Sequence, residues 1–134
     1  MLSAKQLAKF FDHTLLSPTA STQEITQLCN EAKEYQFFSV CVHPSKLNLC
    51  KELLEDSGVE LCTVVGFPLG QNSSASKAFE TRDAIQRGAT EIDMVMNVAE
   101  LKEGNDHYVV EDIKAVNEAS GTNLVKVIIN SPSH

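Results

Sequence analysis

The sequence has few basic residues for its length, and this excludes several classes of partner. Lys and Arg number 11 against 18 Asp and Glu, which gives a formal net charge of −7 at neutral pH. Such a chain is a poor match for a nucleic-acid backbone or an anionic membrane surface, so we expect neither partner. One local lysine is enough to hold a phosphate, so a small anionic substrate remains compatible with the composition.

Membrane and metal signals are also missing from the sequence. No apolar run approaches the roughly 20 residues of a membrane-spanning helix, and the first residues lack the apolar core of a signal peptide. None of the four cysteines belongs to a C-x-x-C pair, and their spacing fits no zinc motif. Most of them lie in apolar surroundings, which predicts buried, reduced thiols, no metal site and a cytoplasmic protein. These cysteines are Cys29, Cys41, Cys50 and Cys62.

Internal repeats, low-complexity tracts and linkers are absent too, so residues 1–134 are expected to form a single domain. What the chain does show is an alternation of strand and helix patterns, with strands starting near residues 11, 37, 60, 91 and 124. Helices are predicted over 3–10, 21–35, 44–54, 76–87 and 107–119. This spacing is typical of βα units with parallel strands and right-handed crossovers. An open doubly wound sheet and a partial (β/α)8 barrel both fit the pattern.

Charged side chains interrupt two strands that should otherwise be apolar. A period of two places Asp93 and Asn97 on one face of the fourth strand, and Lys126 and Asn130 on one face of the fifth. A carboxylate and an ammonium group would thus face each other across neighbouring strands. A structural ion pair and a catalytic pair both remain open, because a buried charge needs a partner in either case. Asp12 is a third candidate on the same interior, or alternatively a residue of an N-terminal turn.

The loop Gly66–Gly70 follows the third strand at its C-terminal end. Its glycines permit unusual backbone angles and close approach, and active sites of α/β folds gather at this end of the sheet. The loop matches neither G-x-G-x-x-G nor a P-loop, so a tight connection without a ligand is an equally good interpretation.

Six ordered segments of the chain resemble the successive signatures of the deoxyribose-phosphate aldolase family. They are Asp12–Leu16, Ser39–Pro44, Cys62–Gly70, Lys77–Glu80, Gly88–Asn97 and Val125–Ile129. The resemblance covers essentially residues 7–129 and implies a partial TIM (β/α)8 barrel, with about five parallel strands and helices on the outer face. It also implies a class I lyase that cleaves 2-deoxyribose 5-phosphate to glyceraldehyde 3-phosphate and acetaldehyde. That reaction proceeds through a lysine Schiff base without a metal or other cofactor.

The resemblance assigns roles to particular residues. Asp93 matches the family's proton-relay carboxylate, and Lys126 matches an interior lysine close to the reacting centre, so these two are the catalytic candidates. Four further residues match positions that line the substrate pocket, namely Asp12, Thr14, Cys41 and Phe67.

The sequence also departs from the family pattern. Ser17 stands where the family usually has lysine, His43 where it has asparagine, and Asn130-Ser131 where it has glutamate and threonine. The K-T-S-T-G segment with the nucleophilic lysine does not occur within these 134 residues. We therefore expect a truncated aldolase-like domain that is inactive alone. The alternatives are an active lyase, with the amine supplied by Lys126 or by a partner chain, and a non-catalytic sugar-phosphate-binding or assembly module.

Self-association is the last expectation from the sequence. A barrel interior without its opposite wall would expose apolar residues, and hiding them would favour a homodimer or a higher homo-oligomer. The residues predicted to form this exposed face are Leu61, Thr63, Val65, Val95 and Ile128.

Overall fold

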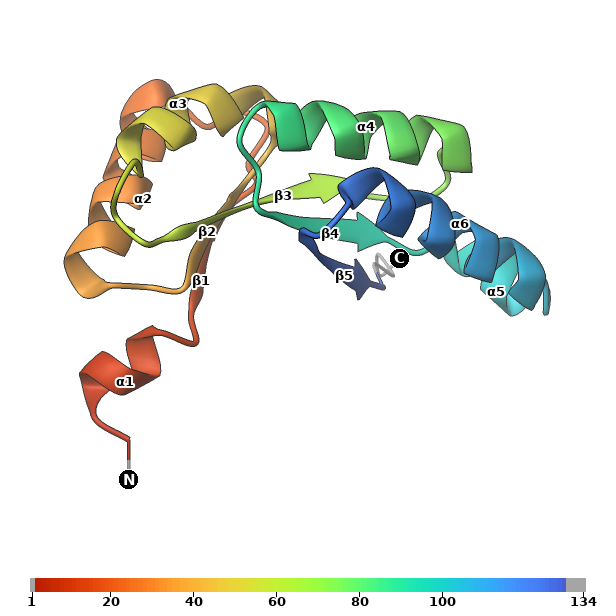
Figure 1. The fold of residues 1–134 in the computed structure, drawn as a ribbon, viewed down its shortest axis with the longest axis horizontal. Helices are drawn as coiled ribbons and strands as arrows, with labels where there is room; N and C mark the ends of the chain where they lie inside the picture. The colour runs from red at the N-terminus through yellow and green to blue at the C-terminus, as the bar shows by residue number, and fades with distance from the viewer. Residues whose placement is uncertain (1, 130–134) are drawn as a thin grey trace. The chain divides into compact units, whose positions relative to one another are not determined.

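A computed structural model describes residues 2–129 of the chain. The predicted strand position of Asn130, and the departure at Asn130-Ser131, lie outside the described residues. Five parallel strands follow one another in the order β1-β2-β3-β4-β5 (Figure 1). This order lacks the reversal that defines a doubly wound sheet, so the barrel alternative is the one that fits.

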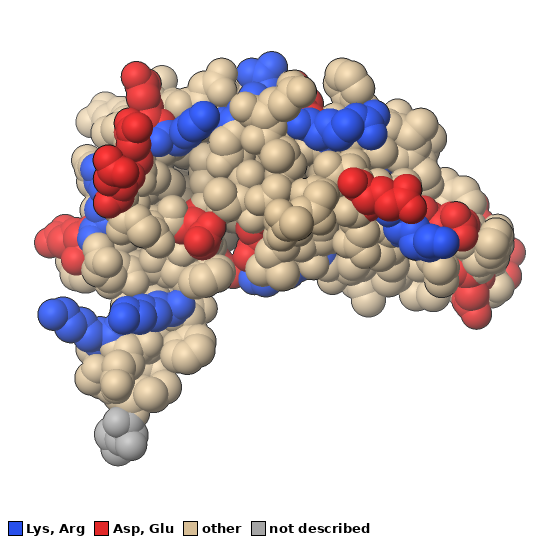
Figure 2. Space-filling model, in the orientation of Figure 1, with Lys and Arg blue, Asp and Glu red and all other residues tan. Residues whose placement is uncertain are grey.

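The chain divides into two compact units. Unit 1 contains the residues up to Thr63 together with Arg87–Thr90, and unit 2 contains Val64–Gln86 together with the residues from Glu91 onward. Side chains of both signs lie next to one another on the face drawn in Figure 2, as expected of a chain that carries 11 basic and 18 acidic residues. Among the described residues, no helix combines the length and the apolar character needed to span a bilayer.

Unit 1 contains the elements from α1 to the first part of β3. They are α1 (Ala4–Ala8), β1 (Asp12–Leu15), α2 (Thr22–Tyr35), β2 (Ser39–Val42), the 3-10 turn η1 (Pro44–Lys46), α3 (Leu47–Leu53) and β3 (Glu60–Val65). The capping box predicted for α2 is present: Ser21 Oγ accepts from the Glu24 N–H, and the Glu24 side chain accepts from the Ser21 N–H. The apolar stripe of α2 packs against β1, β2 and α3, which fixes the first two strands.

Unit 2 continues from the end of β3. Its elements are α4 (Ser74–Gln86), β4 (Glu91–Val95), α5 (Val98–Lys102), α6 (Asp106–Ser120) and β5 (Leu124–Ile128). Helix α4 packs along α6, and α6 also covers β5. The sequence did not predict α5, because five residues are too few to show a helical period. Asn97 caps the N-terminus of this helix, because its Oδ1 accepts a hydrogen bond from the Glu100 N–H.

The predicted exposed apolar face is wrong for four of its five residues. Leu61, Thr63, Val65 and Val95 are all buried, and only Ile128 is partly exposed. Both faces of β3 are covered, because Cys62 and Val64 on its other side are buried as well, and the strand pattern alone does not show this. In β3, Leu61 and Thr63 lie on the side opposite Cys62. The exposed apolar side chains of the last strand region are instead Leu124 (51%), Val127 (38%) and Ile129 (64%).

Candidate functional site

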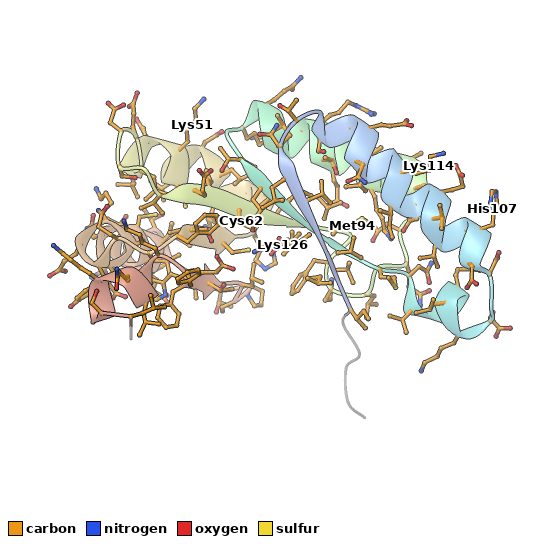
Figure 3. The ribbon with its side chains drawn as sticks, turned by 60° about the horizontal axis from the view of Figure 1, so that its bottom comes forward. Lys51, Cys62, Met94, His107, Lys114 and Lys126 are labelled. Carbon is orange, nitrogen blue, oxygen red and sulfur yellow. The ribbon has the colours of Figure 1, made fainter. Side chains whose placement is uncertain are left out.

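The two catalytic candidates occupy neighbouring positions on unit 2. Asp93 of β4 is the register partner of Lys126 of β5, so the adjacency predicted from the strand pattern is confirmed. Figure 3 labels Lys126 on β5. Both side chains are partly exposed, which leaves them accessible to a small molecule. A carboxylate and a lysine at adjacent positions of parallel strands are suited to exchange a proton and to hold an anion.

A third charged residue, Glu91, shares this strand face. Its Oε1 lies 3.5 Å from Lys126 Nζ, and the Glu91 side chain is only 2% exposed. Neither carboxylate oxygen of Glu91 has a hydrogen-bond partner among the described residues. Glu91 was not among the residues predicted from the sequence, although the period of two that singled out Asp93 places Glu91 on the same face. The nearby carboxylate stabilises the positive charge of Lys126.

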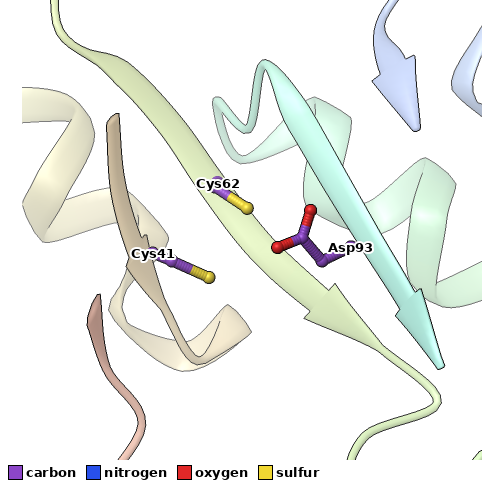
Figure 4. Close-up of side chains that lie close together, drawn as sticks. All are labelled: Cys41, Cys62 and Asp93. Atoms are coloured by element: carbon purple, nitrogen blue, oxygen red, sulfur yellow. The ribbon is translucent and has the colours of Figure 1, made fainter. Parts of the chain in front are cut away.

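The pocket candidates of unit 1 lie along β1 and β2. Asp12 is the first residue of β1 rather than a turn residue, and its Oδ1 accepts a 2.5 Å hydrogen bond from Ser39 Oγ. Thr14 is the register partner of Cys41, and Cys41 is in turn the register partner of Cys62. Figure 4 shows the thiols of Cys41 and Cys62 on the same side of their strands. The structure therefore brings Thr14 and Cys41 together, while Asp12 lies two residues earlier on β1.

The two departures Ser17 and His43 line one cavity of unit 1. This cavity measures about 360 Å3 and lies beyond the C-terminal ends of β1 and β2, with Lys46 on its wall. His43 Nε2 lies 2.8 Å from the carbonyl oxygen of Leu16, which ties the segment after β2 to the segment after β1. Polar groups thus surround the end of the first two strands even where the family lysine is replaced.

Phe67 belongs to the loop Gly66–Gly70 in unit 2, and the backbone of this loop is unusual. Gly66 and Gly70 have φ angles of +68° and +72°, and the Phe67–Pro68 peptide bond is cis. The Gly70 N–H donates to the Gly66 carbonyl at 2.7 Å, which closes the loop on itself. A Cβ on Gly70 would collide with the backbone of Val95 and Met96, so the loop passes directly over the end of β4.

Two side chains of α4 hold this loop. Glu80 Oε1 accepts a 3.1 Å hydrogen bond from the Gly66 N–H, and Lys77 Nζ donates to the Gly70 carbonyl at 2.8 Å. Burial raises the pKa of Glu80, although the Gly66 hydrogen bond and the charge of Lys77 oppose the shift. From the sequence, Lys77 and Glu80 were recognised only as members of a family segment. Their helical spacing with the buried residues Thr81 and Ala84 is the signal that could have marked Lys77 as a core residue.

A family model and curated relatives cover nearly all of this chain. The model for "DeoC/LacD family aldolase" matches residues 6–132. A deoxyribose-phosphate aldolase from Clostridium botulinum (strain Langeland) is 56% identical over 126 residues, which are 94% of this chain and 59% of the relative. One from Streptococcus suis (strain 05ZYH33) is 55% identical over 94% of this chain and 57% of its own length. The chain thus spans about three-fifths of the length of these relatives.

Solved structures agree with the fold. A candidate deoxyribose-phosphate aldolase from Coccidioides immitis superposes with a TM-score of 0.91 at 39% identity, over 94% of this chain and 50% of the other. A deoxyribose phosphate aldolase from Aeropyrum pernix, described as a tetramer, gives a TM-score of 0.79 at 34% identity, over 93% and 53%. Each match takes up about half of an aldolase barrel, so the fold described here is a partial barrel.

Proposed function

The chain belongs to the DeoC/LacD family of aldolases, and from this premise we propose that its residues supply the acid–base part of a deoxyribose-phosphate aldolase site. The reaction would be the cleavage of 2-deoxyribose 5-phosphate to glyceraldehyde 3-phosphate and acetaldehyde. The observation that carries the proposal is the adjacency of Asp93 and Lys126 on β4 and β5.

In this proposal Asp93 exchanges a proton with the substrate, and Lys126 remains an ammonium group. A lysine acts as a Schiff-base nucleophile only as a free amine, which requires desolvation or a cationic neighbour. Lys126 instead has the carboxylate of Glu91 at 3.5 Å, and its side chain is 42% exposed. Its charge is therefore suited to attract the phosphorylated substrate and to stabilise a neighbouring anion rather than to form the covalent bond.

The K-T-S-T-G segment does not occur in the 134 residues, so we propose that the chain tested by itself is inactive. The test is an assay of deoxyribose 5-phosphate cleavage, together with borohydride trapping in the presence of acetaldehyde and mass spectrometry. We expect neither product nor a trapped adduct above background. Cleavage by the chain alone, abolished by Lys126→Ala, would instead establish Lys126 as the amine.

A complementation experiment tests the positive part of the proposal. The chain is co-expressed with the part of the Clostridium botulinum relative that lies outside the matched region. We expect cleavage to appear in the mixture and to fall at least about 100-fold in Asp93→Asn, because the amide cannot accept the proton. Lys114→Met is the matched control, since Lys114 is an exposed residue of α6 (Figure 3). Full activity of Asp93→Asn would exclude the assigned role.

A non-catalytic sugar-phosphate-binding module is the second candidate function. The observation that favours it is the cavity beside Ser17, His43 and Lys46, which offers a cation and polar groups suited to a phosphate. Stabilisation of the chain against heat by deoxyribose 5-phosphate, without any turnover in the complemented mixture, would support this alternative over the first.

We also propose that the protein is cytoplasmic and assembles with copies of itself. Four buried free cysteines are typical of proteins in a reducing compartment. The Aeropyrum pernix relative is described as a tetramer, and the apolar side chains of Val127 and Ile129 are exposed on one face at the end of β5. Light scattering at micromolar concentration should give a mass of at least twice 14.7 kDa. A stable monomer would contradict the assembly, and Val127→Lys should shift an oligomer toward monomer.

A further inference from the structure

Lys77 is a fully buried lysine that joins three segments of unit 2. Its Nζ donates to the Gly70 carbonyl at 2.8 Å, to the Val95 carbonyl at 3.1 Å and to Asp112 Oδ2 at 2.5 Å. The side chains of Lys77 and Asp112 are 0% and 2% exposed. Ser74 Oγ donates to the other oxygen of Asp112 at 2.7 Å, so both carboxylate oxygens are bound. The ammonium group thus connects the loop after β3 with the last residue of β4 and with α6.

Stability alone does not explain a charged pair at this place. Removing an ion pair from water costs free energy that its attraction often fails to recover, and apolar residues of similar volume commonly stabilise such a site equally well. A lysine does one thing here that an apolar residue cannot do. It donates to two backbone carbonyls, Gly70 and Val95, that belong to different segments.

The glycines of the loop are matched to this lysine. A Cβ on Gly66 would come within 2.9 Å of Lys77 Cε, so the loop can rest on the lysine stem only because this position has no side chain. The Gly66 N–H is bound at the same time by Glu80, one helical turn after Lys77. Two side chains of α4 therefore bind the backbone on both sides of Phe67, Glu80 at Gly66 and Lys77 at Gly70.

We propose that Lys77 is a positioning residue for the aldol cleavage. It holds the loop that carries Phe67 against Val95 at the end of β4, two residues after Asp93. Lys77 thereby fixes the position of Phe67, a proposed pocket residue, relative to the carboxylate of Asp93. This inference rests on the proposed function for its catalytic consequence, whereas the anchoring of the loop stands on the contacts of Lys77 alone.

The first test measures hydrogen exchange at the loop amides in the 134-residue chain. Lys77→Met retains most of the side-chain volume and removes the three donors. We expect the amides of Gly66 and Gly70, which are hydrogen-bonded in the folded chain, to exchange at least ten-fold faster, while amides within α6 and β5 keep their rates. Lys114→Met, on the exposed side of α6, should leave the loop unchanged. Uniform acceleration of all amides, or no acceleration in the loop, would overturn the anchoring.

The double variant Lys77→Met/Asp112→Leu covers the case in which the single variant does not fold, because it also removes the orphaned carboxylate. We expect it to unfold at or above the wild-type temperature and still to show the fast-exchanging loop. A stable protein with a fast-exchanging loop would show that Lys77 fixes the position of the loop, because a purely structural role would appear as a loss of stability. Wild-type exchange rates in the loop of this stable double variant would refute the proposal.

The second test uses the complemented enzyme. The double variant should lower kcat/KM at least ten-fold although it is at least as stable to heat as the wild type, and an unchanged kcat/KM would overturn the catalytic consequence. If the wild-type mixture itself shows no cleavage, the proposed function fails, and the exchange experiment still decides whether Lys77 anchors the loop.

Discussion

The ammonium group of Lys126 lies 3.5 Å from a carboxylate oxygen of Glu91, a residue that is almost completely buried at the start of β4. Asp93, the residue singled out from the strand pattern, is the register partner of Lys126 and lies two positions further along the same strand face. Lys126 therefore lies beside a strand face that carries two carboxylates. Its positive charge offsets the buried negative charge of Glu91 and is also available at the proposed site next to Asp93.

A double-mutant cycle measures the interaction between Glu91 and Lys126. We expect Lys126→Ala to destabilise the chain, because it leaves the buried Glu91 carboxylate without this cation, and Glu91→Gln to relieve most of that loss. Since the lysine is partly in water, the coupling free energy should be only about 1 kcal/mol and should decrease in high salt. Urea denaturation of the four proteins gives the value. A coupling free energy of zero at low salt would show that the contact between Glu91 and Lys126 does not contribute to stability.

The close approach of Gly70 to the end of β4 predicts a large effect of a single methyl group. Gly70→Ala would adopt a strained positive φ and would also press a Cβ against the backbone of Val95 and Met96. Gly104 is a matched control, because its φ is +77° and nothing lies within 4 Å of the place that an added methyl group would take. We expect Gly104→Ala to lose about 1–2 kcal/mol from backbone strain alone. Gly70→Ala should lose more than about 3 kcal/mol, and equal losses in urea denaturation would rule out the close contact.

The buried cysteines predict an unreactive native protein. All four thiols are buried. The hydrogen bond that the Cys50 thiol donates to Cys29, together with burial, raises the pKa of Cys50, and the same bond lowers the pKa of Cys29. Cys29 is 0% exposed, so a reagent cannot reach it in the folded chain. Since the thiolate is the reactive form, a chromogenic disulfide reagent should label the folded chain very slowly and all four thiols in denaturant. Ser45→Cys, at an exposed position, is the positive control and should add one fast-reacting thiol. Rapid labelling of the native wild type would mean that an element carrying one of the cysteines, namely α2, β2, α3 or β3, unfolds locally.

Much of the fold could be predicted from local sequence patterns. The alternating apolar segments located all five strands, and the capping signal at Ser21 located the start of α2 to within one residue. These features depend on a few consecutive residues, and a period of two or 3.6 reports them directly. Helix α5 was missed because its five residues are too few to establish a period, and its cap is a single side-chain contact from Asn97.

The contacts of the site were harder to predict than its strands. The alternation in residues 91–97 placed Asp93 next to Lys126, but it could not show that the Lys126 ammonium group also reaches back to Glu91. Lys77 is a stronger case, because lysine is normally a surface residue and its three acceptors come from distant segments. Only the folded chain brings Gly70, Val95 and Asp112 around one ammonium group. The exposed apolar face predicted for β3 is wrong for a similar reason, because the local pattern does not show that both faces of this strand are covered.

The carboxyl group of Glu80 predicts a pH dependence of stability. Burial raises its pKa above the ordinary value of 4.5, although the Gly66 hydrogen bond and Lys77 act in the opposite direction. The folded state therefore binds this proton more tightly than the unfolded state. The resulting contribution to stability is fully present below pH 4.5 and is lost as the pH rises through the folded-state pKa. Glu80→Gln removes the titration, and the amide oxygen can still accept from the Gly66 N–H.

We therefore expect Glu80→Gln to gain stability relative to the wild type as the pH is raised from about 4 to about 7. Urea denaturation at each pH measures the difference between the two proteins. Glu111→Gln is the matched control, because Glu111 is an exposed residue of α6 that lies 3.8 Å from Lys114, and its difference should stay nearly constant. If the wild type instead gains on Glu80→Gln as the pH rises, the hydrogen bond to Gly66 and the charge of Lys77 outweigh burial. The ionised Glu80 carboxylate would then contribute more to holding the loop against α4 than its desolvation costs.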